Sequence, residues 1–436
     1  MTRGMIRITD RLATISVTGS AYVSVAVVAV CATFGVVHAL PPGDSSQPWD
    51  TTAWESPETP SSNEQSLDPE RIEWSVFPEI SYTSDDGFFF GAMGVVADYE
   101  PGYYPYQWRF EGQSSVSVRP DENGDPEFPT HDHYLDFDLP GIVKGVRMRF
   151  RAGYQRELRR YRGFGNSSQR IPDNVAAAVG QYRYSSPSFQ WHTRTTTVKN
   201  LFITTMFQYQ YVWMDVFRGS RLRDDADGKS GPQSSKLIHG LNRHHLLIGG
   251  VGLEYDSRNH ETHPTGGMYH SVMLSGGIEG TGEFGYGSLA IRSRLYLSVY
   301  ERWLVLALRL DSDLFLGNPP VYALPVLGGE RILRGVPDGF YHGLIRVTGS
   351  TEFRSMFWSF NIWTHRFELG AAAFIDFGRV FSGYEPLESL DGEGPGIHFG
   401  TGGGLRLSWG ESLMFRFDAA WSPEALGFYA TLGQAF

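Results

Sequence analysis

The chain contains a single cysteine, Cys31, among its 436 residues. Without a second thiol, the sequence excludes a disulfide framework and a thiolate metal site. Long apolar runs are also missing beyond the N-terminus, where none reaches the ~20 residues that a membrane-spanning helix needs. A helical membrane protein is therefore not expected.

An excess of positive charge is absent too. The 37 Lys and Arg residues are outnumbered by 48 Asp and Glu residues, so the net charge is -11. Because nucleic-acid-binding surfaces are basic, no nucleic-acid partner is expected. No Gly-x-Ser-x-Gly elbow occurs, His131-Asp132-His133 fits a polar strand edge better than a metal cluster, and the glycines of 400–404 fit a bend inside a strand. We therefore expect no enzyme activity, metal or cofactor.

The N-terminus has the pattern of an export signal. Three arginines precede a mostly small and apolar stretch at 21–37, and Val37-His38-Ala39 is a plausible cleavage site. This predicts a signal peptide at 1–39, with an uncleaved membrane anchor as the alternative. Residues 40–72 are rich in Pro, Ser, Thr, Asp and Glu, which predicts a disordered periplasmic linker.

From about residue 73 onward, apolar and polar residues alternate in many segments. Between 413 and 421 the odd positions are apolar, whereas Arg416 and Asp418 occupy even ones. This period of two indicates strands with one apolar and one wet face, which a soluble sandwich would also show. Expected strand lengths of about 9–13 residues exceed the usual ~5–6, and arginines recur on the polar face. Both features favour a membrane barrel with a water-filled lumen.

The pattern predicts an all-β fold, a transmembrane antiparallel β-barrel of about sixteen strands over residues 73–436. We expect strands at 75–83, 88–98, 107–119, 131–139, 143–160, 179–192, 197–214, 244–257, 267–279, 284–301, 303–316, 345–357, 367–377, 397–409, 413–421 and 427–436. The long connections all follow odd-numbered strands, namely 120–130, 161–178, 215–243, 317–344 and 378–396. Short ones, such as 140–142 and 193–196, follow even-numbered strands. Outer-membrane barrels have long outer loops and short periplasmic turns, so this segregation supports the count and places both termini in the periplasm.

The end of the chain fits a closing barrel strand. Phe428, Leu432 and Phe436 share one face at period two, and the chain stops on an aromatic residue. Such a residue is expected in the aromatic girdle at the membrane boundary, although Gln434 interrupts the apolar face. We therefore predict that these three residues form a C-terminal barrel signal.

Three segments stand out from the strand pattern: Leu327-Gly-Gly-Glu-Arg-Ile-Leu-Arg-Gly-Val336, Ser350-Thr-Glu-Phe-Arg354 and Phe374-Ile-Asp-Phe-Gly378. Alternation turns Glu352 and Asp376 toward the lumen from adjacent strands. Two carboxylates held close repel each other unless a cation intervenes. An arginine fork could serve both, and breaking such a buried group would cost about 3–5 kcal/mol, against under ~1 kcal/mol in a wet lumen.

These segments resemble the BamA/TamA superfamily of outer-membrane barrels, also called bacterial surface antigens. The resemblance implies a sixteen-stranded barrel whose sixth outer loop folds into the lumen, where a loop arginine pairs with acids on strands twelve and thirteen. The alternative is that these charges are unrelated. The residues of the implied loop lock are Arg334, Gly335, Glu352, Phe374, Asp376 and Gly378.

Other stretches carry the same resemblance, at 81–87, 161–166, 254–258 and 433–436. Val336 departs from the family, which has an aromatic residue there, so looser docking of the loop tip is expected. Family members usually carry periplasmic POTRA modules. The residues between leader and barrel are too few for one, so none is expected.

By resemblance, the chain would insert or translocate proteins at the outer membrane of a Gram-negative cell. The expected basis is a weak seam between the first strand, short and carrying Pro78, and the last, because proline belongs on an edge and a client strand could pair there. Expected partners are outer-membrane lipid, unfolded outer-membrane or secreted clients, and periplasmic assembly factors. Alternatives are a passive or structural pore and, more remotely, a barrel-borne hydrolase. Lumen arginines would either select anions or pair with lumen acids: Arg147, Arg149, Arg151, Arg292, Arg294, Arg309 and Arg416.

Overall fold

The computed structural model describes residues 72–83, 86–100, 106–121, 123–167, 180–229, 236–260, 263–300, 303–362, 365–385, 387–409 and 413–436. The signal peptide expected at 1–39 lies outside these residues. So does the linker expected at 40–72, except for Ile72, which begins the first strand.

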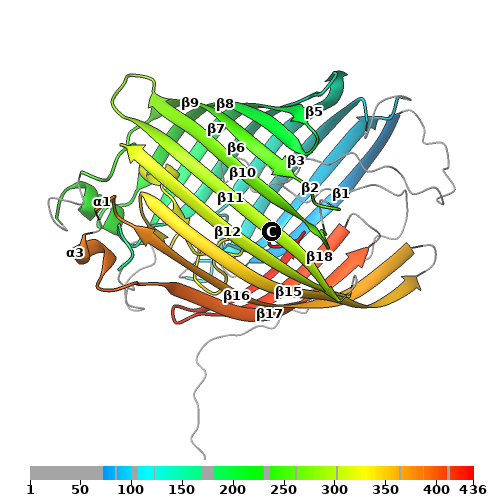
Figure 1. Cartoon of the computed structure of the whole chain (residues 1–436). Coiled ribbons are helices and arrows are strands. Elements are labelled where there is room, and N and C mark those ends of the chain that lie inside the picture. The colour runs from blue at the N-terminus through cyan, green and yellow to red at the C-terminus, as the bar shows by residue number, and fades with distance from the viewer. Residues whose placement is uncertain are drawn as a thin grey trace, which may run out of the picture. The chain divides into compact units, whose positions relative to one another are not determined.

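Sixteen strands form a closed antiparallel barrel, in which each pairs with its neighbours along the chain and the last with the first (Figure 1). They are β1 (Ile72–Thr83), β2 (Gly87–Asp98), β3 (Trp108–Pro120), β5 (His131–Val143), β6 (Val146–Arg160), β7 (Gln181–Val198), β8 (Leu201–Val216), β9 (His244–Asp256), β10 (Gly267–Glu279), β11 (Gly285–Tyr300), β12 (Leu304–Gly317), β15 (Ile345–Ile362), β16 (His365–Phe381), β17 (His398–Trp409), β18 (Leu413–Trp421) and β19 (Leu426–Leu432). The predicted fold class is thus confirmed. The long connections follow β3, β6, β8, β12 and β16, each of which is an odd-numbered strand of the barrel.

Two short turns differ from the prediction. The connection expected at 193–196 is part of β7, and the chain turns at 199–200 instead. Asn200 adopts a φ of 65° there, a left-handed conformation that Asn tolerates better than most residues. The turn expected at 140–142 lies at 144–145, where Gly145 has a φ of 77°.

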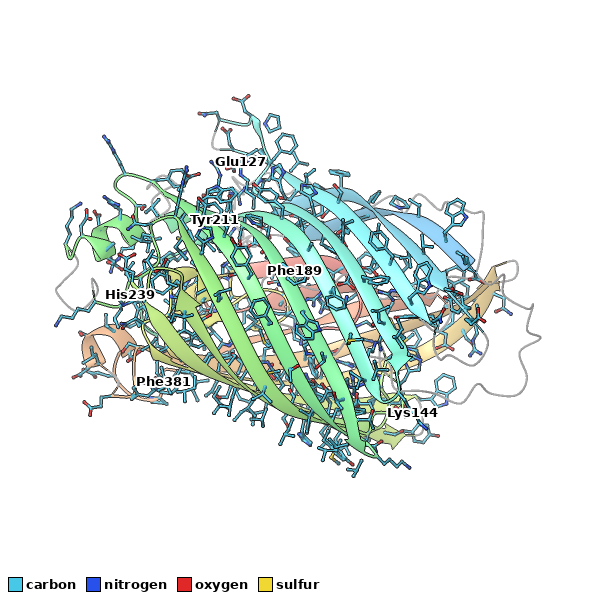
Figure 2. All side chains as sticks on the ribbon, turned by 90° about the horizontal axis from the view of Figure 1, so that it is seen from above. Glu127, Lys144, Phe189, Tyr211, His239 and Phe381 are labelled. Carbon is cyan, nitrogen blue, oxygen red and sulfur yellow. The ribbon has the colours of Figure 1, made fainter. Side chains whose placement is uncertain are left out.

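Alternation places apolar side chains outside and polar ones inside. On β8, Ile203 and Phe207 are exposed, whereas Thr204, Met206 and Gln208 are buried. The outward side chains form an apolar wall, part of which is seen in Figure 2. Among the described residues no helix is long and apolar enough to cross a membrane.

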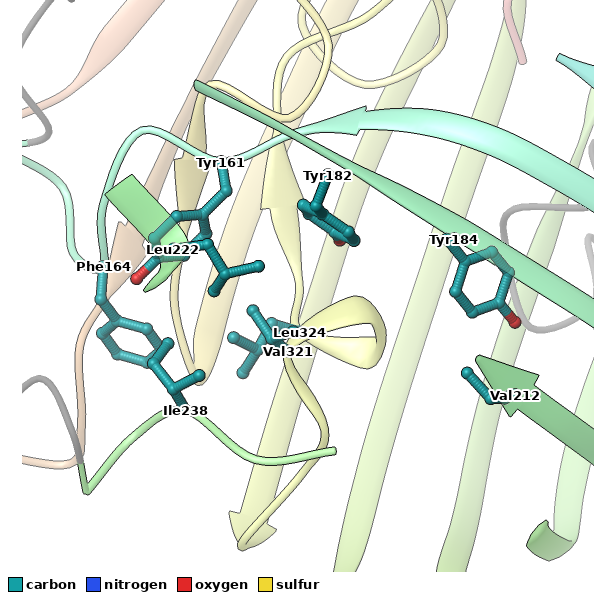
Figure 3. Close-up of a cluster of buried hydrophobic side chains, with 9 residues drawn as sticks. All are labelled: Tyr161, Phe164, Tyr182, Tyr184, Val212, Leu222, Ile238, Val321 and Leu324. Carbon is teal, nitrogen blue, oxygen red and sulfur yellow. The ribbon is translucent and has the colours of Figure 1, made fainter. Parts of the chain in front are cut away.

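The loop end of the barrel holds a cluster of buried apolar side chains (Figure 3). It combines inward residues of β7 and β8 with residues of three connections, including α1 (Arg221–Ala226) and the 3-10 helix η3 (Val321–Ala323). Tyr161 adds a hydrogen bond to Asp225 at 2.9 Å. The members are Tyr161, Phe164, Tyr182, Tyr184, Val212, Leu222, Ile238, Val321 and Leu324.

The closing strand is shorter than predicted. β19 ends at Leu432, and Gly433 follows with a φ of 82°, so the strand expected to reach Phe436 stops early. Phe436 packs inside the barrel against Tyr296, Val305 and Ala307. Its expected place in the girdle is therefore wrong.

The other two residues of the C-terminal barrel signal belong to β19. Phe428 is 51% exposed on the outer face, where the prediction put it. Leu432 pairs with Phe415 through the backbone, and its side chain lies outside the described part of the chain.

Candidate functional site

The connection between β12 and β15 places its tip among buried residues. Its strands β13 (Val326–Leu327) and β14 (Tyr341–His342) pair with each other. Leu327, Leu333 and Val336 are fully buried, together with Phe340 and Tyr341. Val336 is thus enclosed although it is smaller than an aromatic residue, and the looser docking expected from it is not observed.

Arg334 in this tip contacts both acids that the sequence singled out. Its Nε and Nη2 donate to the two carboxylate oxygens of Asp376 at 2.8 and 2.9 Å, a bidentate geometry. Its Nη1 donates to Glu352 at 2.8 Å. All three side chains are buried, so the short bonds lie in a dry environment where charge-assisted pairs are strong.

A third acid completes the cluster. Asp418 on β18 accepts from Nη1 of Arg334 at 3.1 Å. Arg406 on β17 bridges Asp418 and Glu352 at 2.5 and 3.2 Å, and Arg354 donates to Glu352 at 2.8 Å. Alternating acids and guanidinium groups offset the repulsion between carboxylates. Asp418 is an addition to the site expected from the sequence, although alternation predicted its inward position.

The motif at 374–378 lies on β16, the thirteenth strand of the barrel, and supports the loop in two further ways. The guanidinium carbon of Arg334 lies 3.3 Å from the ring centroid of Phe374, a cation–π arrangement. At Gly378, a Cβ would come within 2.6 Å of the Leu327 side chain. Phe374 therefore contacts the loop arginine, and Gly378 leaves room for the Leu327 side chain of the loop.

Glycines let the loop backbone approach the wall. Gly335 has a φ of 91°, donates to the Tyr429 hydroxyl at 3.1 Å and accepts from Ser422 at 3.0 Å. A Cβ on Gly400 would lie 1.9 Å from the Arg334 carbonyl oxygen. The run at 400–404, interpreted from sequence as a bend, thus includes a close-approach position that sequence reasoning missed.

The segment Tyr161–Asn166 holds the same loop from the mouth side. The Gly165 N–H donates to the His342 carbonyl in the loop at 2.7 Å, and the Asn166 side chain anchors the segment to the wall by accepting from Val380 on β16 at 3.2 Å. Burial, together with the nearby positive charge of Arg159, lowers the pKa of His342 to about 3. His342 is therefore neutral at pH 7.

The end of the chain joins the cluster. The backbone oxygen of Phe436 accepts from Arg354 at 2.8 Å, and the ring centroid lies 4.8 Å from that guanidinium. Arg406 also donates to Gln434 at 3.0 Å. The arginines that bind Glu352 therefore hold the residues that follow β19 as well.

The remaining lumen arginines pair with acids. In the 254–258 stretch, Asp256 binds Arg258 at 2.9 Å and Glu254 binds Arg194 at 2.5 Å. Each of the seven arginines considered for anion selection lies within 4.0 Å of a carboxylate, which favours pairing. Across the described ranges, no group of three or more His, Cys, Asp or Glu residues could hold a metal ion.

A family model described as the Omp85 superfamily domain matches residues 132–436. Among solved structures, BamA from Haemophilus ducreyi lacking POTRA domains 1-3 has a TM-score of 0.56 at 15% identity, covering 83% of this chain and 71% of that one. CdiB from Escherichia coli has a TM-score of 0.54 at 12% identity, covering 84% and 63%. No curated protein matches. At these identities the structures show a common fold.

Proposed function

The chain belongs to the Omp85 superfamily, and we propose that it is an outer-membrane barrel that inserts or translocates other proteins through the seam between β1 and β19. Its loop arginine would keep the lumen plugged and the closing strand short. The observation that carries the proposal is the pairing at this seam.

β1 and β19 pair only at Tyr82 with Ala430 and Thr83 with Tyr429 within the described residues. The same register would set Leu432 opposite Ile80, so 72–79 extends past the end of β19. At 3.3 Å per residue this is an unpaired edge of roughly 25 Å. The other edge of β1 is paired with β2 along its whole length, which makes β1 a firmly held template for an added strand.

The weak pairing of the seam has a different cause from the one predicted from the sequence. β1 has 12 residues and is not short; the short partner is β19, with 7 residues. Pro78 does lie in the stretch of β1 that β19 leaves free, as a proline on an edge strand is expected to. The contacts of Gln434 and Phe436 inside the barrel support a closing strand that is withheld from β1.

A passive pore would require an open lumen. The buried loop tip, the paired lumen arginines and the apolar cluster of Figure 3 favour a plugged barrel instead. Planar-bilayer conductance separates the two functions. Low current that rises in Arg334→Ala supports the plug, whereas a steady wild-type current unchanged by that substitution supports the pore.

Cysteine cross-linking tests client contact in a Cys31→Ser background. Val76 lies on the free stretch of β1, and Val251 on β9 is a matched control, since both are exposed and Val251 pairs on both sides. We expect Val76→Cys, and not Val251→Cys, to capture nascent outer-membrane proteins. Equal capture at the two positions, or none at Val76, would refute the seam as the client site.

Sealing the seam tests whether it must open. Tyr82 and Ala430 are register partners, close enough for a disulfide when both are cysteine. We expect oxidised Tyr82→Cys/Ala430→Cys to lose client insertion and to regain it on reduction. The equivalent pair Val251→Cys/Leu274→Cys, between fully paired strands, should have no effect.

A further inference from the structure

The outer wall carries a group of basic side chains that the lumen site does not use. We define it as the basic patch: His131 on β5, Arg156 on β6 and Arg183 on β7. His131 and Arg156 are register partners. Arg156 is in turn the register partner of Ser185, so Arg183, two residues away on β7, is its diagonal neighbour on the same face. The patch therefore concentrates positive charge in a chain whose net charge is -11.

These side chains point out of the barrel. Arg183 lies between Tyr182 and Tyr184, which are buried in the interior cluster, so alternation turns Arg183 outward. Arg156 lies between Gln155 and Glu157, which bond to each other. The same alternation puts it on the outer face of β6.

A belt of rings runs beside the patch. Tyr154 stacks on His133 at 6.2 Å and on Trp213 at 6.1 Å, and Tyr211 contacts Trp213 at 5.7 Å and His245 at 4.7 Å. Figure 2 labels Tyr211 toward one end of this wall and Lys144 toward the other. Tyr and Trp rings gather where a barrel wall meets the membrane surface.

The apolar wall below the belt has the height of a membrane. Along β8, outward positions run from Ile203 to Trp213, which spans roughly 25 Å once strand tilt is allowed for. Asp215, the next outward residue, is the register partner of Arg183. The patch therefore lies at the level of the lipid headgroups, on the side of the long loops.

The patch arginines are available to a ligand. Within the described residues, neither Arg156 nor Arg183 has an acid within the 4.0 Å of an ion pair. Asp215 is exposed, and Glu157 binds Arg159 on the inner face. A guanidinium group presents a planar fork that matches phosphate oxygens. Two such forks beside an imidazole thus form a surface complementary to a phosphate at the membrane boundary.

We propose that His131, Arg156 and Arg183 bind the phosphate of a lipid headgroup in the outer leaflet. The inference rests on the proposed outer-membrane location, and it is independent of client insertion, so either can fail alone. The belt rings would contact the sugar or glycerol part of the same headgroup, and the apolar wall its acyl chains.

Native mass spectrometry of the folded barrel tests the site, with lipid A, a phosphorylated glycolipid, as the probe. We expect Arg156→Gln/Arg183→Gln to weaken binding about tenfold, as for the loss of two charge-assisted bonds. Lys144→Gln/Lys199→Gln is the matched control, because both lysines are exposed in the short turns at the opposite rim. This control should bind as wild type does.

Two further arms identify the ligand. Phosphate-free lipid A should bind the wild type about as weakly as lipid A binds the glutamine variant, and millimolar inorganic phosphate should not displace lipid A. Equal binding of both lipids, displacement by inorganic phosphate, or equal loss in the lysine control would overturn the proposal. If the glutamine variant does not fold, Arg156→Lys/Arg183→Lys takes its place in the binding measurement, because it keeps the charge and lacks the planar fork. This lysine variant should bind lipid A more weakly than wild type.

Discussion

Replacing Arg334 with alanine should be among the most destabilising single changes in this barrel. The substitution removes a cation from three buried carboxylates. These carboxylates do not depend on Arg334 equally, because some of them keep other cations. Glu352 keeps Arg354 and Arg406, and Asp418 keeps Arg406. Asp376 has no other cation within 4.0 Å in the part of the chain that the structure describes.

The magnitude follows from this asymmetry. Breaking a buried ion pair by removing one partner costs about 3–5 kcal/mol, because the other charge stays buried without compensation. We therefore expect a loss in that range for Arg334→Ala. Asp376→Asn should cost less, since Arg334 would still bind Glu352 and Asp418. In Arg334→Ala/Asp376→Asn the orphaned charge is gone, so the double variant should be more stable than Arg334→Ala alone.

Urea unfolding in lipid vesicles, followed by tryptophan fluorescence and gel mobility, measures these differences. A matched control is Arg366→Ala, because Arg366 binds Glu368 at 2.6 Å in an exposed pair and should contribute under ~1 kcal/mol. If Arg334→Ala were no more destabilising than this control, or if Asp376→Asn failed to rescue it, the cluster would be a solvated group of charges that does not hold the loop.

Three other changes test neighbouring features. Gly400→Ala should displace the loop tip, because its Cβ would meet a loop carbonyl. We expect it to lower the unfolding free energy by about 1–3 kcal/mol in the same assay. Gly249→Ala is the control, because Gly249 has open space around it, and it should not have this effect. His342 binds a proton in the unfolded chain below about pH 6.5 but resists it in the folded barrel down to about pH 3, so stability should fall as the pH drops through this window, by up to about 1.4 kcal/mol per unit. His342→Phe should flatten that slope in unfolding measured from pH 7 to 4. Phe436→Ala should lower the unfolding free energy in the same assay, because its ring packs against Tyr296, Val305 and Ala307.

Much of the barrel could be predicted because a period of two records which face of a strand is wet. That pattern located all sixteen strands and turned Glu352 and Asp376 inward. It could not identify Asp418 as a ligand of Arg334, because alternation gives the face of a residue and not which distant strands meet across a lumen. The tail was misplaced for a related reason: Gly433 can adopt a left-handed φ, and Phe436 finds arginine partners inside that no local pattern reveals.

The lumen cluster also implies that the loop and the closing strand cannot vary independently. Arg406 donates to Glu352, Asp418 and Gln434, so one guanidinium group serves both the acids of the loop arginine and the residue that follows β19. If the loop left the lumen, Glu352 and Asp418 would lose one cation and draw more strongly on Arg406. The bond from Arg406 to Gln434 would then compete with two less compensated carboxylates. Release of Gln434 would free the tail to extend along β1, so a state with the loop withdrawn should be one with a longer seam, and Gln434→Ala should lengthen the seam while the loop stays in place.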